Sequence, residues 1–143
     1  MKQEGKTLME LMVVVAIVGI VAVMAVPNFL SLNSRAQARC ATEEIASELR
    51  LARQLAITHR DRVRIVFDFE QQVMTAHFVN GSTMSRIYRY GDKGIVIDEP
   101  SAGPEILFHP SGRSATATTI QLRSKEGQIQ KLTVSMTGRV SIL

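Results

Sequence analysis

The feature that most constrains this chain is an uncharged, largely apolar run near its start. No Asp, Glu, Lys or Arg occurs from Leu11 to Ser34. That length slightly exceeds the roughly 20 residues that a helix needs to cross the hydrocarbon core of a bilayer. A secretory signal peptide is the alternative, because Val23-Met24-Ala25 is a tolerable cleavage site of the signal-peptide kind. The chain is therefore expected to begin with a membrane helix or with an export signal.

A single carboxylate, Glu10, lies directly before this run. An ionised side chain next to hydrocarbon is costly, and such residues usually have a function and a partner. Neither a plain membrane anchor nor a signal peptide explains why a glutamate is placed there. Glu10 is therefore the first candidate functional residue.

The residues around Glu10 resemble the N-terminus of type IV pilins and type II secretion pseudopilins. Gly5 is followed directly by Lys6, and Pro27 lies late in the apolar run. The resemblance implies that a prepilin peptidase cuts after Gly5 and that Lys6 becomes the N-methylated first residue. It also implies that Glu10 acts in filament assembly and that Pro27 kinks the helix. In this chain Lys6 replaces the usual Phe or Met, and Glu4 replaces the usual Lys or Arg.

Cleavage after Gly5 also suggests a partner for Glu10. It would create an ammonium group at Lys6, one helical turn before the glutamate. Within a filament, the amine of one subunit can meet the carboxylate of its neighbour. Each charge alone in an apolar bundle would cost several kcal/mol, and pairing offsets much of that cost. The pair would select the register of the subunits as well as attract them.

The helix is expected to continue beyond the apolar run. Between residues 35 and 61, small or apolar residues recur at steps of three and four, which marks one face of a helix. That face comprises Ala38, Ala41, Ile45, Leu49, Ala52 and Leu55 or Ala56. We predict a solvated opposite face with Arg39, Glu43, Glu44, Arg50, Arg53 and Gln54. Cys40, the only cysteine, is predicted to be a small buried hydrophobe.

From residue 62 the period changes from helix to strand. Val63, Ile65, Phe67 and Phe69 alternate with more polar positions, which indicates a half-buried strand. Turn signals then separate further short runs, at Asn80-Gly81, residues 91–94, residues 125–128 and Thr137-Gly138. We predict an α+β fold with about eight antiparallel strands packed on the helix. The expected organisation is a leader at 1–5, an assembly helix at 6–34, an amphipathic helix at 35–61 and a β domain at 62–143.

The β half resembles the H-type pseudopilins and the minor pilins close to them. The segments that carry this resemblance are FHPSGRS, from Phe108, and VSMTGRVSI, near the end of the chain. The lack of a cysteine pair at the C-terminus favours a minor, tip-associated subunit over a major pilin. Some relatives bind DNA through Gly-Arg-x-Arg, and here that stretch ends in Ser141. Arg113 and Arg139 are retained as candidate DNA contacts.

The remaining polar residues predict no catalytic chemistry. His59, His77 and His109 have no spacing typical of metal ligands, and no Ser or Thr is paired with a His and an acid. The formal net charge of +4 is compatible with a soluble surface, anionic lipid or DNA. We expect no enzyme activity, no metal and no cofactor.

Taken together, the sequence predicts a minor pseudopilin of a type II secretion system. Its expected partners are other pilin-like subunits, the prepilin peptidase and the inner-membrane assembly platform. It is expected in the inner membrane, with its N-terminus in the cytoplasm and its β domain in the periplasm. The alternative is a minor type IV pilin that acts in pilus assembly or DNA uptake. An exported domain cut after Ala25 stays open as a third hypothesis.

Overall fold

The computed structural model describes residues 6–80, 85–124 and 127–143, with only the backbone given for residues 6, 7 and 27–31. The chain divides into two compact units, Met1–Ser34 and Arg35–Leu143. Helix α1 spans Lys6–His59 and contributes to both.

In the first unit, α1 is an apolar helix without a protein cover. Leu8–Val26 has a mean hydropathy of 2.7, and none of this segment is buried within the chain. It is long and apolar enough to cross a membrane, judged by length and composition. In a helix every backbone group of the segment finds its partner internally, as hydrocarbon requires.

In the second unit, α1 is the spine of the domain. The predicted stripe is buried and comprises Ala38, Ala41, Ile45, Leu49, Ala52 and Ala56. The small alanines allow strands to approach the helix axis closely. The helix ends at His59, and Arg60 follows with a φ of 52°, a left-handed conformation that commonly stops a helix. The Asp61 carboxylate then accepts the N–H of Arg62 and the side-chain amide of Asn80.

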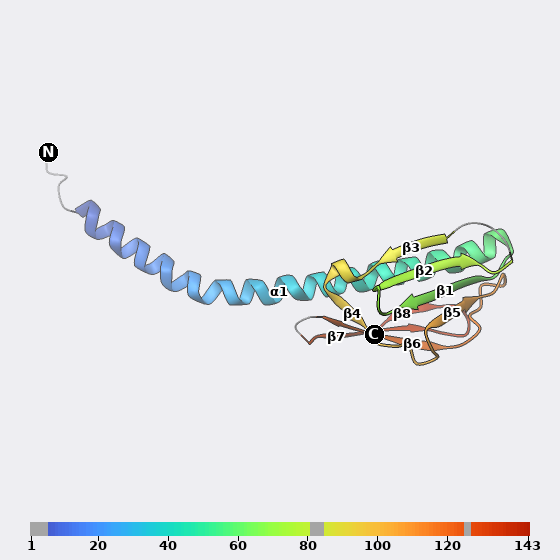
Figure 1. Cartoon of the computed structure of the whole chain (residues 1–143). Helices are drawn as coiled ribbons and strands as arrows, with labels where there is room; N and C mark the ends of the chain where they lie inside the picture. The colour runs from blue at the N-terminus through green and yellow to red at the C-terminus, as the bar shows by residue number, and fades with distance from the viewer. Residues whose placement is uncertain (1–5, 81–84, 125–126) are drawn as a thin grey trace. The chain divides into compact units, whose positions relative to one another are not determined.

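Two four-stranded antiparallel sheets follow (Figure 1). The first has the order β3-β2-β1-β5, and the second has the order β4-β6-β7-β8. A 3₁₀ helix, η1, spans Gly91–Lys93 between β3 and β4. The strand bounds are β1 Val63–Asp68, β2 Val73–Phe78, β3 Ser85–Arg89, β4 Ile95–Ile97, β5 Glu105–Phe108, β6 Thr118–Ser124, β7 Ile129–Val134 and β8 Val140–Ile142.

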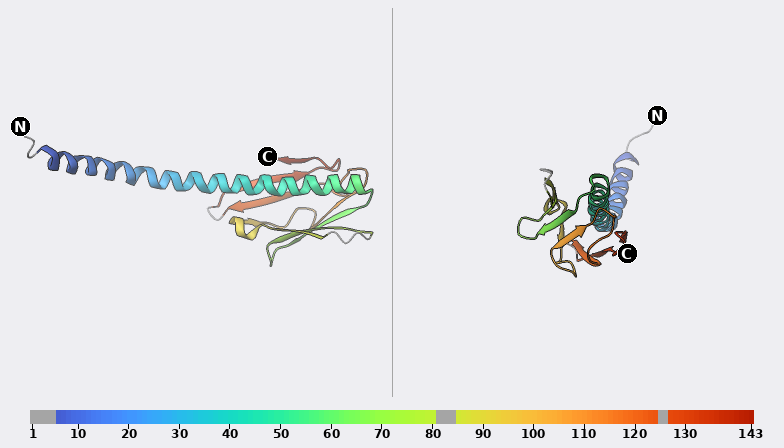
Figure 2. Two further views of the ribbon diagram at one scale, coloured as in Figure 1. Left: turned by 90° about the horizontal axis from the view of Figure 1, so that it is seen from above. Right: turned by 90° about the vertical axis from the view of Figure 1, so that its right-hand side faces the viewer.

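Both sheets lie beside the second half of α1 (Figure 2), and the three share one hydrophobic core. The alternation predicted for β1 is confirmed, because Val63, Ile65 and Phe67 are buried and the residues between them are half-exposed. Ile120, Leu122 and Leu132 fill the same core from the second sheet. The α+β fold, with a long helix packed on antiparallel sheets, is therefore confirmed.

Two predictions about the helix were wrong. Cys40 is exposed rather than buried, because the buried stripe passes through Ala41 and Thr42 instead. The face opposite the stripe was predicted to be simply solvated, yet Glu44 and Arg53 bind other elements of the domain. Parts of two predicted turns, at 81 and 125–126, lie outside the described residues.

Candidate functional site

The structure covers the predicted N-terminal site only in part. Gly5 lies outside the described residues, and Lys6 and Pro27 are described by their backbone alone, inside α1. Glu10 is described and is exposed on the uncovered apolar helix. Cleavage after Gly5, methylation of Lys6 and a kink at Pro27 therefore stay predictions.

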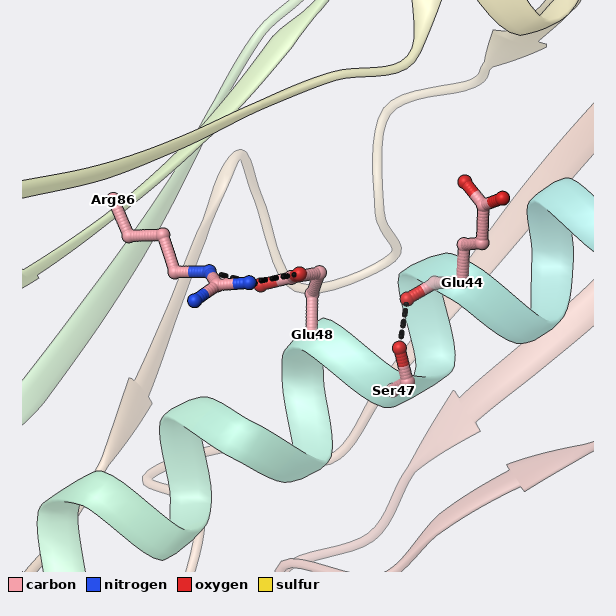
Figure 3. A network of polar contacts seen from close by, with 4 residues as sticks. All are labelled: Glu44, Ser47, Glu48 and Arg86. Carbon is pink, nitrogen blue, oxygen red and sulfur yellow. Dashed lines mark hydrogen bonds and ion pairs between the residues drawn. The ribbon is translucent and has the colours of Figure 1, made fainter.

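A second polar site joins α1 to the edge strand β3. The Arg86 guanidinium donates two hydrogen bonds of 2.8 Å to the Glu48 carboxylate (Figure 3). One turn earlier in the helix, the Glu44 carboxylate accepts a 2.6 Å hydrogen bond from the Tyr88 hydroxyl and a 3.2 Å bond from the Lys93 ammonium. No residue of β3 is fully buried. The backbone ladder to β2, the packing of Tyr88 against the core and these polar bonds to the helix hold the strand in place.

These contacts alter the proton affinity of both partners. The hydrogen bond from Tyr88 lowers the pKa of Glu44, and Lys93 lowers it further. Burial raises the pKa of the Tyr88 hydroxyl, and the neighbouring Glu44 carboxylate raises it again. Glu44 is therefore expected to stay ionised, and Tyr88 protonated, throughout the physiological pH range.

We expect this contact to weaken in acid. Because the pKa of Glu44 is lowered on folding, its stabilisation is complete above the ordinary carboxyl pKa of 4.5 and is lost as pH falls through the folded value. Glu44 is 43% exposed, so the effect should be only a few tenths of a kcal/mol. The measurement is urea unfolding of the full chain in detergent at decreasing pH. The free energy of unfolding should fall less steeply with acid in Glu44→Gln than in the wild type, and Tyr88→Phe should also make this fall smaller. Glu43→Gln controls for net charge, and an acid loss unchanged in Glu44→Gln would contradict the assignment.

A third site brings together the two Gly-Arg segments noted in the sequence. In the first turn, the N–H of His109 donates to the carbonyl of Arg113, and the N–H of Gly112 to that of His109. Ser135, Gly138 and Arg139 repeat the same pattern. Gly112 and Gly138 both have a left-handed φ, 77° and 76°, as the αL position of a three-residue hairpin loop requires.

The two turns pack on each other and on α1. The N–H of Ser114 donates to the carbonyl of Met136, and the Arg53 guanidinium donates a 2.8 Å hydrogen bond to the carbonyl of Gly112. A β-carbon on Gly138 would collide with that same carbonyl oxygen. The contact between the turns thus depends on the absence of a side chain at Gly138.

The candidate DNA contacts lie on these adjacent turns. Arg113 and Arg139 are both exposed, and each directly follows the glycine of its turn. Two nearby cations of α1 donate to the protein's own carbonyls: Arg53 to Gly112, and Arg50 to Val140. Within the described ranges, Arg113 and Arg139 are thus the two arginine side chains of these turns without a hydrogen bond or ion pair, fewer cations than phosphate-backbone binding usually recruits.

The histidines and acids do not form a metal site among the residues described. No group of three or more His, Cys, Asp or Glu side chains is suitably placed in the described ranges. The ring of His59 packs against Phe78 in a tilted arrangement, with 5.0 Å between ring centroids, and Asp98 pairs with Arg123. His77 lies on β2, and His109 begins the first Gly-Arg turn.

Comparison with known protein families shows which family this chain belongs to. Residues 41–138, the last third of α1 and nearly all of the β domain, match the family described as type II transport protein GspH. The chain belongs to the GspH family. Residues 1–26 match the prokaryotic N-terminal methylation motif. The pseudopilin resemblance predicted from the sequence is thereby confirmed.

Solved structures share the fold. The type IV minor pilin FimU of Pseudomonas aeruginosa superposes with a TM-score of 0.64 at 18% identity, covering 78% of this chain and 92% of FimU. The minor pseudopilin EpsH of the Vibrio cholerae type 2 secretion system superposes with a TM-score of 0.60 at 16% identity, covering 75% of this chain and 96% of EpsH. No curated protein sequence matches significantly.

Family membership fixes the coarse role of this GspH-family chain. Pseudopilins and minor pilins are structural subunits rather than enzymes, and they associate with other pilin-like subunits in a filament. The apolar helix agrees with a subunit anchored in the membrane before assembly.

Proposed function

We propose that this chain is a minor pseudopilin that is processed by a prepilin peptidase and joins a short periplasmic filament of a type II secretion system. The observation that carries the proposal is the uncovered helix Leu8–Val26, which has Glu10 near its start and none of its length buried in the chain. Such a helix needs lipid or other helices around it. Its match to the methylation motif favours helices of other subunits as the final partner.

The N-terminal residues have distinct roles in this proposal. The peptidase cuts after Gly5, and Lys6 becomes the methylated N-terminus. The Glu10 carboxylate pairs with the N-terminal amine of a neighbouring subunit as both leave the bilayer. Pro27 lacks a backbone donor and bends the helix so that it can pack in the filament.

The proposed topology places the N-terminus in the cytoplasm and the β domain in the periplasm. The subunit waits in the inner membrane, and the assembly platform moves it into the filament. The one cysteine of the sequence, Cys40, lies on α1 and is free, so no disulfide within this chain stabilises the β domain. Its stability then depends on the apolar core that α1 and the two sheets share.

A minor type IV pilin is the second candidate, favoured by the fold shared with FimU. In that role the adjacent Arg113 and Arg139 turns are the surface to test for DNA contact. The family match to the type II transport protein favours the secretion role.

Deletion of the gene should separate the two candidates. In the secretion role, exported proteins accumulate in the periplasm, whereas surface pili and DNA uptake stay normal. Complementation with the Arg113→Gln, Arg139→Gln double variant should restore secretion fully. Normal secretion together with lost pili would contradict the proposal, and lost DNA uptake in the double variant would favour the second candidate.

A further inference from the structure

The outer face of the first sheet carries a hollow that none of the sites above uses. Its volume is about 550 Å³, and it opens beside the edge strand β3. Its apolar lining includes Val66, Val73 and Ile87. Ile87 is 61% exposed, which is unusual for a large aliphatic side chain in the middle of a strand.

The strand beside the hollow has a free edge. In the described part of the chain, β3 pairs only with β2. The ladder continues into a hydrogen bond from the N–H of Tyr90 to the carbonyl of Gln72. Because hydrogen-bonded pairs alternate along an antiparallel ladder, Tyr88 also faces β2, whereas the N–H and C=O of Ile87 and Arg89 point away from it.

Among the described residues, this edge has one of the usual protections against pairing, the charge of Arg89, which no carboxylate neutralises. Edge strands are commonly blocked by proline, a bulge or an unpaired charge. β3 contains no proline, and its register with β2 is unbroken. The Arg86 charge is neutralised by Glu48. The bonds from Arg86 and Tyr88 to α1 also keep the strand in an extended form, ready to pair.

The charged side chains that line the hollow are mainly acidic, although the chain as a whole is basic. Asp68 and Asp92 line it, with Arg89 as the one cation among its lining residues. No hydrogen bond or ion pair joins the side chains of Asp92 and Arg89 to other described residues. The net negative charge of this hollow, on a protein of net charge +4, favours a cationic group on whatever binds there.

We propose that the free edge of β3 binds an extended segment of a different protein, which adds a fifth strand to the first sheet. Backbone hydrogen bonds to Ile87 and Arg89 would supply affinity, and side chains in the hollow would supply specificity. The segment carries an aliphatic side chain that packs beside Ile87. Two residues further along it carries a lysine or arginine that reaches Asp92 and Asp68.

A second copy of this chain is disfavoured as the occupant of the edge. Arg86 bonds to Glu48, whereas Tyr88, further along β3, bonds to the earlier helix residue Glu44. β3 therefore runs antiparallel to α1. Symmetric antiparallel pairing of two β3 edges would set residues 35–59 of the two α1 helices in opposite directions. This argument rests on the proposed membrane anchoring, under which copies in one membrane are expected to present their domains in the same direction, and pairing between two copies is an outcome of the test.

The test uses a photoreactive amino acid placed singly at Ile87 or Arg89 of the full chain in its native membranes. We expect adducts from the two positions on residues two apart in one segment of another protein. At the Arg89 probe, Ile87→Asp should reduce the yield about tenfold, a loss of about 1.4 kcal/mol. Asp92→Asn should reduce it less. A probe at Val96, exposed on the edge strand β4, is the matched control.

Several results would overturn the proposal. These are no adduct at either position, adducts without the two-residue spacing, the same adduct from Val96, or an adduct between two copies of this chain. Cleavage after Gly5 is measured on the same samples. If cleavage is correct but adducts with the two-residue spacing are missing, the strand-addition proposal is wrong and the proposed function stands. If cleavage is absent, the result counts against the proposed function.

Discussion

Glu10→Leu should abolish incorporation into filaments while leaving membrane insertion intact. The leucine suits the apolar helix better than the glutamate does, so anchoring is expected to be at least as good. In the filament, however, the N-terminal amine of the neighbouring subunit would lose its counter-charge. Removing one partner of a buried ion pair typically costs about 3–5 kcal/mol, which corresponds to a loss of two or more orders of magnitude in incorporation.

The measurement is the amount of the chain that copurifies with the major filament subunit, normalised to the amount in membranes. Val13→Leu changes an exposed apolar residue of the same helix and is the matched control. Glu10→Gln separates charge from shape and should fail almost as completely as the leucine variant. Wild-type incorporation of Glu10→Leu would remove Glu10 from the assembly mechanism.

Gly138→Ala should destabilise the β domain by about 3 kcal/mol. The left-handed φ of 76° costs about 1–2 kcal/mol for a residue with a side chain. The new methyl group would also collide with the Gly112 carbonyl oxygen and the Arg53 side chain. Overpacking of this kind adds about 1–3 kcal/mol, because two backbone segments have to separate. Urea unfolding of the full chain in detergent measures the change.

Gly127→Ala is the matched control for this prediction. Gly127 has the same place in an equivalent turn, where its N–H donates to the carbonyl of Ser124, and its φ is 82°. Among the described residues, no atom beyond the chain neighbours lies within 4 Å of a β-carbon built there. Gly127→Ala should therefore lower the stability only by the cost of the left-handed φ for a residue with a side chain, about 1–2 kcal/mol. Equal losses for the two variants would show that the contact between the Gly-Arg turns contributes nothing.

Local sequence signals were sufficient to predict the elements of the domain. The two-residue period of β1 and the spacing of Ala38, Ala41 and Ile45 reflect burial that is determined within a few residues. The turn at Gly138 was predictable because few other residues adopt its φ without strain. These predictions needed no knowledge of what packs against each element.

The missed contacts join residues that are far apart in the sequence. Glu44 and Tyr88 are brought together only by the packing of β3 on α1, and Arg53 and Gly112 only by the first Gly-Arg turn. A helix face rich in charge is usually solvated, so no local pattern marks these residues as anchors. Cys40 was missed for another reason: its residue type favours burial, whereas its position off the alanine stripe turns it towards solvent.

The most direct test of the central claim is the intact mass and N-terminal sequence of the protein in membranes with and without the prepilin peptidase. The account predicts a chain that starts at Lys6, one methyl group heavier, only when the peptidase is present. A start at Val26 would instead identify an ordinary export signal cut after Ala25. An uncut Met1 in both samples would leave a simple membrane anchor and contradict the proposed processing.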